Sequence, residues 1–210
     1  MRTTTEPVLI LASASPRRRE LLRRHGYQFR IAEPNHLEPV TDVLRVEPCQ
    51  VAEANAYFKA RSVADAGERG LILGADTIVA YQDRIFGKPE DVDDARRIVS
   101  TLAGTEHEVI TGIALLDTAS YHRRIRHART KVRMRPMPPE ALDEYIASRA
   151  WDGKAGAYGI QDHDDAFIEC IEGSFSNVVG LPMELLADTL TQMGYSELVA
   201  NARTHATEKL

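Results

Sequence analysis

Cysteine is scarce in this chain, and long apolar runs are missing from it. The 210 residues include two cysteines, Cys49 and Cys170, which form no CxxC spacing. This excludes a disulfide framework, so we expect both residues to be reduced thiols. No apolar stretch approaches the roughly 18 residues of a membrane span, and the N-terminal "MRTTTEPVLILAS" lacks the pattern of a signal peptide. We therefore predict a cytoplasmic protein.

An excess of positive charge is also missing. The formal net charge is −5, whereas proteins held to nucleic acid or anionic membranes by general attraction need a basic surface. We expect neither partner, although a small anionic ligand held by a few local cations stays compatible. The sequence also lacks the GxxxxGKS/T, GxGxxG and HExxH patterns, so P-loop ATPases, dinucleotide-dependent dehydrogenases and HExxH zinc enzymes are not indicated.

Short strands and helices alternate along the chain, which predicts one α/β unit. The chain is 43% hydrophobic and 27% charged, enough to bury a core. We predict strands over 8–12, 27–32, 107–117, 121–135 and 165–173, and a hairpin over 70–89 that turns at 82–83. Helical spacing predicts helices over 15–25, 49–67, 91–102, 138–148 and 180–194. We expect one domain over residues 1–197 and a polar tail over 198–210.

The segment "LASASPRRRELL" places cations where a helix normally disfavours them. With Ser15 as the N-cap and Pro16 as the first helical residue, Arg17 and Arg18 fall in the first turn. The helix dipole makes each cation there unfavourable by about 0.3–1 kcal/mol. Free backbone N–H groups, serine hydroxyls and guanidinium groups together are typical of a phosphate site. Helical spacing turns Arg17 and Arg18 towards the protein and Arg19 towards water; a solvated basic face is the alternative.

A second candidate site centres on Asp76, which lies between the apolar runs "LILGA" and "TIVA". A carboxylate in such a position is either a satisfied structural group or one kept for metal or proton chemistry. If the chain turns at 82–83, Lys88 returns within one residue of the position opposite Asp76, where the two would form a metal–phosphate site. Glu38 and Lys59 are further candidates, although each alone is typical of solvated surface.

Two further stretches carry weaker signals. The glycine-rich "KAGAYGIQ" over 154–161 permits close approach of the backbone to a ligand. The acidic run "DHDD" over 162–165 contains side chains that can ligate metals, and we interpret it as a solvated turn.

Five motifs occur in order along the chain: "LASASPRR", "GADTIV", "GKP", "KAGAYGIQ" and "SNVVGLP". Together they resemble the Maf family of nucleoside triphosphate pyrophosphatases over about residues 8–190. The resemblance implies an α/β fold with a two-lobed mixed sheet and flanking helices around a central cleft, similar to the inosine-triphosphate pyrophosphatase type and often dimeric. It implies a hydrolase that converts a nucleoside triphosphate to the monophosphate and pyrophosphate with Mg²⁺ or Mn²⁺.

The resemblance also implies roles for individual residues. Asp76 matches the proton acceptor, and Asp76 with Glu38 would bind the metal. The positions that would contact phosphate are Ser13, Arg17, Arg18, Lys59 and Lys88, and we place Lys59 and Lys88 with Asp76 and Glu38 in the catalytic set.

Base choice is associated with Arg17, Thr77 and Gln161. Thr77 and Gln161 make the chain similar to the dTTP/UTP pyrophosphatase branch rather than to the 7-methyl-GTP branch. A glutamine amide can pair with a pyrimidine's oxygen and N–H in both directions, which is the role we assign to Gln161. The segments "NAYFKA" (55–60) and "DHDD" (162–165) depart from the family pattern. Both departures affect the expected edges of the base pocket.

Two other functions stay open at this point. A nucleotide-binding regulator of septum formation would keep the arginines and lysines without needing Asp76. A general phosphomonoesterase would release orthophosphate instead of pyrophosphate. The partner we expect is a nucleoside triphosphate, and the assembly we expect is a homodimer.

Overall fold

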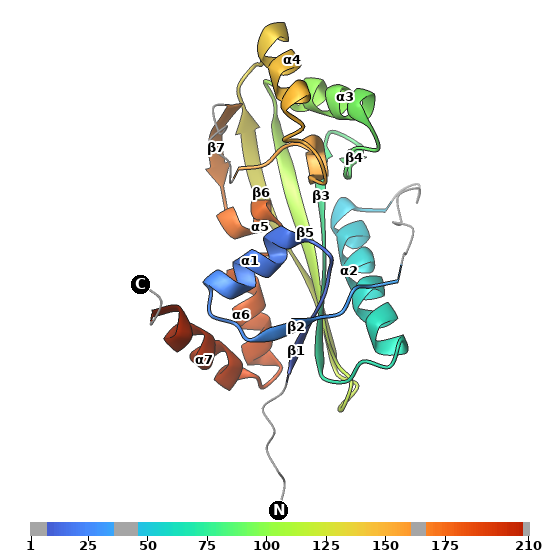
Figure 1. Cartoon of the computed structure of the whole chain (residues 1–210), viewed down its shortest axis with the longest axis vertical. Coiled ribbons are helices and arrows are strands. Elements are labelled where there is room, and N and C mark those ends of the chain that lie inside the picture. Colours follow the sequence, from blue (N-terminus) through green and yellow to red (C-terminus); the bar gives the residue numbers. More distant parts are fainter. Residues whose placement is uncertain (1–7, 36–45, 161–166, 208–210) are drawn as a thin grey trace, which may run out of the picture.

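The computed structural model describes residues 8–35, 46–160 and 167–207 (Figure 1). Seven strands form one mixed sheet in the order β2-β1-β3-β5-β6-β7, and β4 pairs with β3 outside this path. β1 (Leu9–Ala12) runs parallel to β2 (Phe29–Ile31) and to β3 (Leu71–Tyr81). The other pairings are antiparallel and involve β4 (Arg84–Phe86), β5 (Glu106–Asp117), β6 (Arg123–Met134) and β7 (Ile168–Glu172).

Helices cover the two faces of the sheet unequally. α2 (Pro48–Asp65) packs on one face, where it encloses two small apolar clusters. The other face carries the main core and the remaining helices, which are α1 (Pro16–Arg24), α3 (Val92–Leu102), α4 (Pro139–Ser148), the short η1 (Ala155–Ala157), α5 (Phe175–Val179), α6 (Met183–Gln192) and α7 (Ser196–Thr207).

The long strands β3, β5 and β6 extend from one lobe to the other, and a separate group of helices packs on them in each lobe. α3 and α4 lie at one end of these strands, and α1, α6 and α7 lie at the other end (Figure 1). The expected α/β fold with two lobes on a mixed sheet is therefore confirmed.

α2 approaches the sheet so closely that two sheet positions have no room for a side chain. A Cβ added at Gly74 would lie 2.1 Å from the carbonyl oxygen of Ala56, and one at Gly112 would lie 2.3 Å from that of Ala52. Ala52, Ala56 and Ala60 are fully buried against these strands. The alanine stripe and the two glycines therefore bring the whole α2 backbone against β3 and β5.

The segment that we expected to be a polar tail after residue 197 is helical over the part that the structure describes. Residues 196–207 form α7, in which Val199 is 7% exposed and Ala202 is 3% exposed. A Cβ at Gly26, just after α1, would lie 2.0 Å from the carbonyl oxygen of Ala202. The sequence hides this helix because only a narrow stripe of it is apolar.

The other predicted elements agree with the structure within a few residues. The hairpin turns at 82–83, where Gln82 has a φ of 53°. α1 begins at Pro16 with Ser15 as its N-cap, as expected. The short α5 was not predicted. None of the helices among the described residues is long and apolar enough to cross a membrane.

Candidate active site

The site lies at a break in one edge of β3. β1 pairs with β3 as far as the Ala12–Gly74 pair, and β4 pairs with the same edge from the Val79–Phe86 pair onwards. Over residues 75–78, no strand of the described chain pairs with this edge of β3. In α/β sheets, ligands bind beyond the carboxyl end of a strand where the sheet divides in this way. Both Asp76 and Thr77 are in the break.

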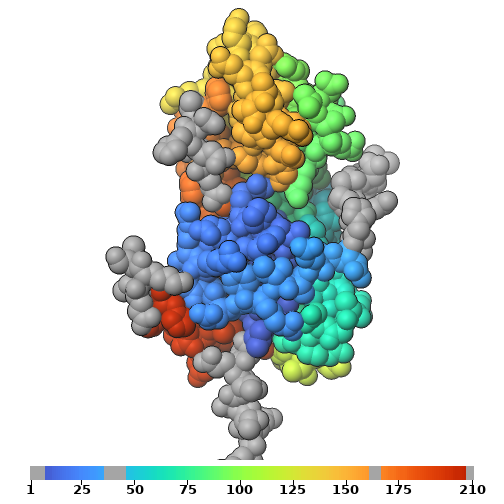
Figure 2. Space-filling view, in the orientation of Figure 1, coloured from blue at the N-terminus to red at the C-terminus, as the bar shows by residue number. Residues whose placement is uncertain are grey.

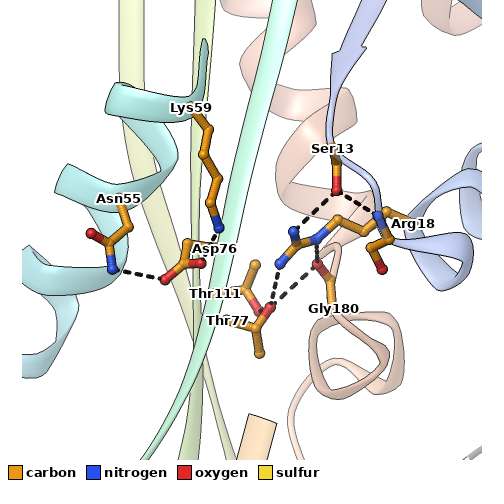
Figure 3. Close-up of polar contacts among 9 residues, drawn as sticks. Ser13, Arg18, Asn55, Lys59, Asp76, Thr77, Thr111 and Gly180 are labelled. Atoms are coloured by element: carbon orange, nitrogen blue, oxygen red, sulfur yellow. Dashed lines mark hydrogen bonds and ion pairs between the residues drawn. The ribbon is translucent and has the colours of Figure 1, made fainter. Parts of the chain in front are cut away.

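Asp76 and Thr77 point to opposite faces of the sheet because side chains alternate along a strand (Figure 3). Asp76 faces α2, where its carboxylate accepts a hydrogen bond from Asn55 Nδ2 at 3.1 Å and forms an ion pair with Lys59. Asn55 and Lys59 are four residues apart on α2, so both project from the same side of the helix. The close packing of α2 is what brings these two side chains to the carboxylate.

On the other face, Thr77 belongs to a network around the buried Arg18 (Figure 3). The Arg18 guanidinium donates from Nε to the carbonyl oxygen of Gly180 at 2.8 Å, from Nη2 to Thr77 Oγ1 at 3.0 Å and from Nη1 to Ser13 Oγ at 3.3 Å. The Thr77 hydroxyl also lies 3.0 Å from that of Thr111. Arg18 thus ties the start of α1 to β3 and to the end of α5.

The N-terminus of α1 opens towards the same place. Ser15 is the N-cap, but its side chain makes no capping hydrogen bond, and its own N–H donates to Ser13 Oγ at 3.1 Å. Free N–H groups at a helix N-terminus attract anions. Arg19 was expected to face water, yet it is half-buried and donates to the carbonyl oxygen of Ala14.

Four cationic side chains gather here, of which Arg18, Lys59 and Lys88 interact with Asp76 and Arg17 interacts with Arg18 and Lys88. Burial lowers the pKa of Lys59, and the charge of Arg18 lowers it further while that of Asp76 raises it. Burial likewise lowers the pKa of Lys88, with further lowering from Arg18, Lys59 and Arg17. These mutual effects mean that the cations lie close enough to disfavour one another. A bound polyanion would relieve this repulsion.

Two adjoining cavities flank these residues. The first is lined by the segment from Ser13 to Arg18 together with Lys59, Lys88 and Asp152, so most of its charged side chains are cationic. The second is lined by Thr77, Lys154, several apolar side chains and the segments around Gly159 and Gly180. Arg17, Lys88 and Gly153 line both cavities, so the two are neighbours, and we refer to them together as the trough.

Arg17 closes one side of this trough. Its Nη2 donates to the carbonyl oxygen of Gly153 at 2.7 Å. The contact joins the start of α1 to the segment between α4 and η1, and Figure 2 shows these blue and gold parts of the chain meeting on one face of the molecule.

The structure brings together most residues that the sequence singled out. These are Ser13, Arg17, Arg18, Lys59, Asp76, Thr77 and Lys88. Glu38, Gln161 and the run 162–165 lie outside the described residues, so their roles stay predictions. Asn55 and Gly180 were missed; the spacing of Asn55 four residues before Lys59 is the signal that could have identified it.

A divalent cation suits this donor set. The described residues contain no group of three or more His, Cys, Asp or Glu side chains that could hold a metal ion. Mg²⁺, however, is usually bound by one or two carboxylates together with substrate phosphates and water. The Asp76 oxygens accept one bond each from Lys59 and Asn55, and a carboxylate has about four lone-pair sites. Asp76 therefore keeps acceptor sites for a cation.

Comparison with known sequences gives a consistent family. The sequence model of the Maf-like proteins matches residues 8–193. A dTTP/UTP pyrophosphatase from Alkaliphilus metalliredigens is 45% identical over 188 residues, which cover 87% of this chain and 94% of the relative. A dTTP/UTP pyrophosphatase from Pelotomaculum thermopropionicum is 40% identical over 190 residues, or 90% of this chain and 98% of the relative.

Solved structures share the fold at low sequence identity. The HAM1 protein from Coxiella burnetii superimposes with a TM-score of 0.53 at 14% identity, covering 89% of this chain and 99% of the other. The Ham1 protein from Staphylococcus aureus gives 0.50 at 12% identity, covering 88% and 98%. At this identity the likeness concerns the fold alone.

Proposed function

Because this chain belongs to the Maf-like protein family, we propose that it is a nucleoside triphosphate pyrophosphatase that hydrolyses dTTP and UTP to the monophosphate and pyrophosphate. The relatives that carry this activity in their names match it over nearly their whole length. The observation that supports the proposal best is the gathering of Arg17, Arg18, Lys59 and Lys88 around Asp76 at the break in β3.

The trough suits an extended triphosphate. The cationic part, with Lys59, Lys88 and the start of α1, would hold the phosphates, and the apolar part beyond Thr77 would hold the base. Among the described residues, four cations stand against two carboxylates, those of Asp76 and Asp152, and this excess of positive charge favours a ligand of high negative charge. Arg18 would serve two purposes, because it holds protein atoms with three of its nitrogen atoms while it also lines the phosphate cavity.

In the proposed reaction, a water molecule attacks the α-phosphorus, and the bond to the pyrophosphate oxygen breaks. Asp76 accepts the proton of the attacking water, and Lys59 and Asn55 hold its carboxylate in one orientation. Lys88 and Arg17 would stabilise the charge that develops on the leaving pyrophosphate. Glu38 is proposed to assist Asp76.

Asp76 and Glu38 would hold a Mg²⁺ or Mn²⁺ ion. When bound, such an ion neutralises phosphate charge and lowers the pKa of a coordinated water. The preference for a pyrimidine base is proposed to depend on Arg17, Thr77 and Gln161. A cytoplasmic location and a homodimer also stay predictions for this chain.

The Asp76→Asn variant tests this proposal. We expect pyrophosphate release from dTTP with Mg²⁺ to fall by at least about 10²-fold, because the proton acceptor is lost, while dTTP still binds. Asp83→Asn, an exposed aspartate in the turn of the same hairpin, is the matched control and should keep full activity. Binding of dTTP without turnover in the parent protein would instead support a nucleotide-binding regulator, and release of orthophosphate would support a phosphomonoesterase.

A further inference from the structure

A histidine and a tyrosine are buried together behind the apolar part of the trough. His107, on β5, is 2% exposed, and Tyr158, just after η1, is 8% exposed. His107 Nε2 lies 2.8 Å from the Tyr158 hydroxyl, and the two rings meet edge to face with centroids 5.4 Å apart. The reaction proposed above uses neither side chain.

The hydrogen bonds around this pair fix the direction of each proton. Thr105 Oγ1 donates to the carbonyl oxygen of Leu102 at 2.8 Å, so its hydroxyl hydrogen is already used. The contact between Thr105 Oγ1 and His107 Nδ1, at 3.3 Å, must then have Nδ1–H as the donor. A neutral imidazole protonated on Nδ1 has a bare Nε2, so the Tyr158 hydroxyl donates to His107.

The neutral form of His107 is the one that this position favours. Burial lowers the pKa of His107 to about 4, and burial also raises the pKa of Tyr158. Near neutral pH, the imidazole therefore accepts and the phenol donates, and a buried hydroxyl of this kind rarely lacks a partner.

Tyr158 also forms part of the cavity wall. It lines the second cavity together with Thr77, Val79, Val109 and Val179. Gly156 leaves room for this ring, since a Cβ added there would lie 3.1 Å from Tyr158 Cε1 and 2.6 Å from Val79 Cγ2. The position of this ring therefore helps to set the width of the cavity.

We propose that His107 is a positioning residue for nucleobase recognition: by accepting the Tyr158 hydroxyl, it fixes the aromatic wall of the cavity that receives the base. This rests on the proposed function, because that function places the base in the second cavity. Neither residue lines the cationic cavity, so the pair affects binding of the nucleoside and leaves binding of the phosphates unchanged.

The test compares two ligands on the full-length chain by titration calorimetry. dTMP reports on the base cavity, and pyrophosphate reports on the cationic cavity. Tyr158→Phe and His107→Leu should raise the Kd of dTMP by roughly 2–10-fold, the amount that one hydrogen bond contributes, and leave the Kd of pyrophosphate unchanged. In turnover, KM for dTTP should rise by the same factor while kcat stays within about twofold.

Two further variants separate positioning from general stability. His107→Gln keeps a side chain that can accept the hydroxyl and should restore much of the dTMP affinity. Tyr27→Phe removes the hydroxyl of another buried tyrosine, which precedes β2 and lines neither cavity, and should change neither Kd. Equal weakening of dTMP and pyrophosphate, or unchanged dTMP binding in Tyr158→Phe, would overturn the inference.

The same titration separates this inference from the proposed function. A parent protein that neither binds dTMP nor hydrolyses dTTP would overturn both. If the parent protein binds dTMP and hydrolyses dTTP, but the variants change the Kd of dTMP no more than that of pyrophosphate, only the role of His107 is overturned.

Discussion

Asp76 and Gly112 are direct cross-strand partners in the antiparallel pairing of β3 with β5. Partner residues in a sheet project to the same face, so Gly112 leaves space beside the Asp76 carboxylate on the face that α2 covers. Gly74, two residues before Asp76, leaves space on the same face. The ion pair with Lys59 therefore depends on two positions that have no side chain.

Substitution of Gly112 by alanine tests this dependence. The new Cβ would lie 2.3 Å from the carbonyl oxygen of Ala52, so α2 must move away from β5 and from Asp76. We expect a loss of at least about 2 kcal/mol in the free energy of unfolding, as for other overpacked cores, and a large loss of turnover. Gly87→Ala, where nothing lies within 4 Å of the added Cβ, is the control for stability. Unchanged unfolding of Gly112→Ala would contradict the close packing.

Arg18→Lys should separate the charge of this residue from its hydrogen-bonding geometry. Lysine keeps the positive charge but cannot reach Gly180, Thr77 and Ser13 together. We expect a loss of roughly 1–3 kcal/mol in the free energy of unfolding, and at least a tenfold loss in kcat/KM for dTTP. Arg23→Lys, on the exposed side of the same helix, should change neither. Equal stability of the two variants, measured by urea denaturation, would refute the bridging role of Arg18.

Stability should fall on the acid side because of His107. The pKa of this residue is lowered from 6.5 to about 4 by burial. Between these values the unfolded chain binds the proton and the folded chain does not, so the free energy of unfolding decreases as the pH falls from about 6.5 to about 4. The full difference corresponds to about 3 kcal/mol. Urea denaturation at pH 7 and pH 4.5 should show a smaller decrease for His107→Gln than for the parent, and parallel decreases would contradict the assignment.

Removal of α7 should destabilise the protein although the family match ends at residue 193. A chain that ends after Tyr195 loses the buried Val199 and Ala202 and uncovers the backbone around Gly26. Burial of one valine side chain contributes about 1.5–3 kcal/mol, so calorimetry should show a lower Tm. A chain that ends after Thr207 is the control. Equal Tm values for the two truncations would mean that α7 adds no stability.

Local patterns predicted the secondary structure well where one signal dominates. The apolar run before Ser13 predicted β1, and Pro16 with the misplaced arginines predicted both the start of α1 and its place in the site. α7 was missed because most of its residues are polar. Its narrow apolar stripe becomes buried only when the helix packs beside the end of α1, which helix propensity and local polarity do not indicate. A short helix such as α5 gives too few turns for a periodic signal.

The composition of the site was less predictable than its existence. Asp76 and Lys88 lie in motifs, and the family resemblance pointed to Lys59. The contact of Asn55 with Asp76, however, depends on how closely α2 packs, which depends in turn on Gly74 and Gly112. The pairing of His107 with Tyr158 joins residues 51 positions apart in the chain. Such pairs follow from tertiary packing, and a single sequence carries no local signal for them.

The alternation of β3 has a consequence for how such proteins diversify. Residues 76 and 77 are covalent neighbours, yet the thickness of the sheet separates their surroundings, with α2 on one side and α1 and α5 on the other. Under the proposed function, ligand preference can therefore change through substitutions at 77 and its contacts without disturbing the proposed proton acceptor next to it. A one-residue deletion earlier in the strand would exchange the two environments and abolish both tasks together.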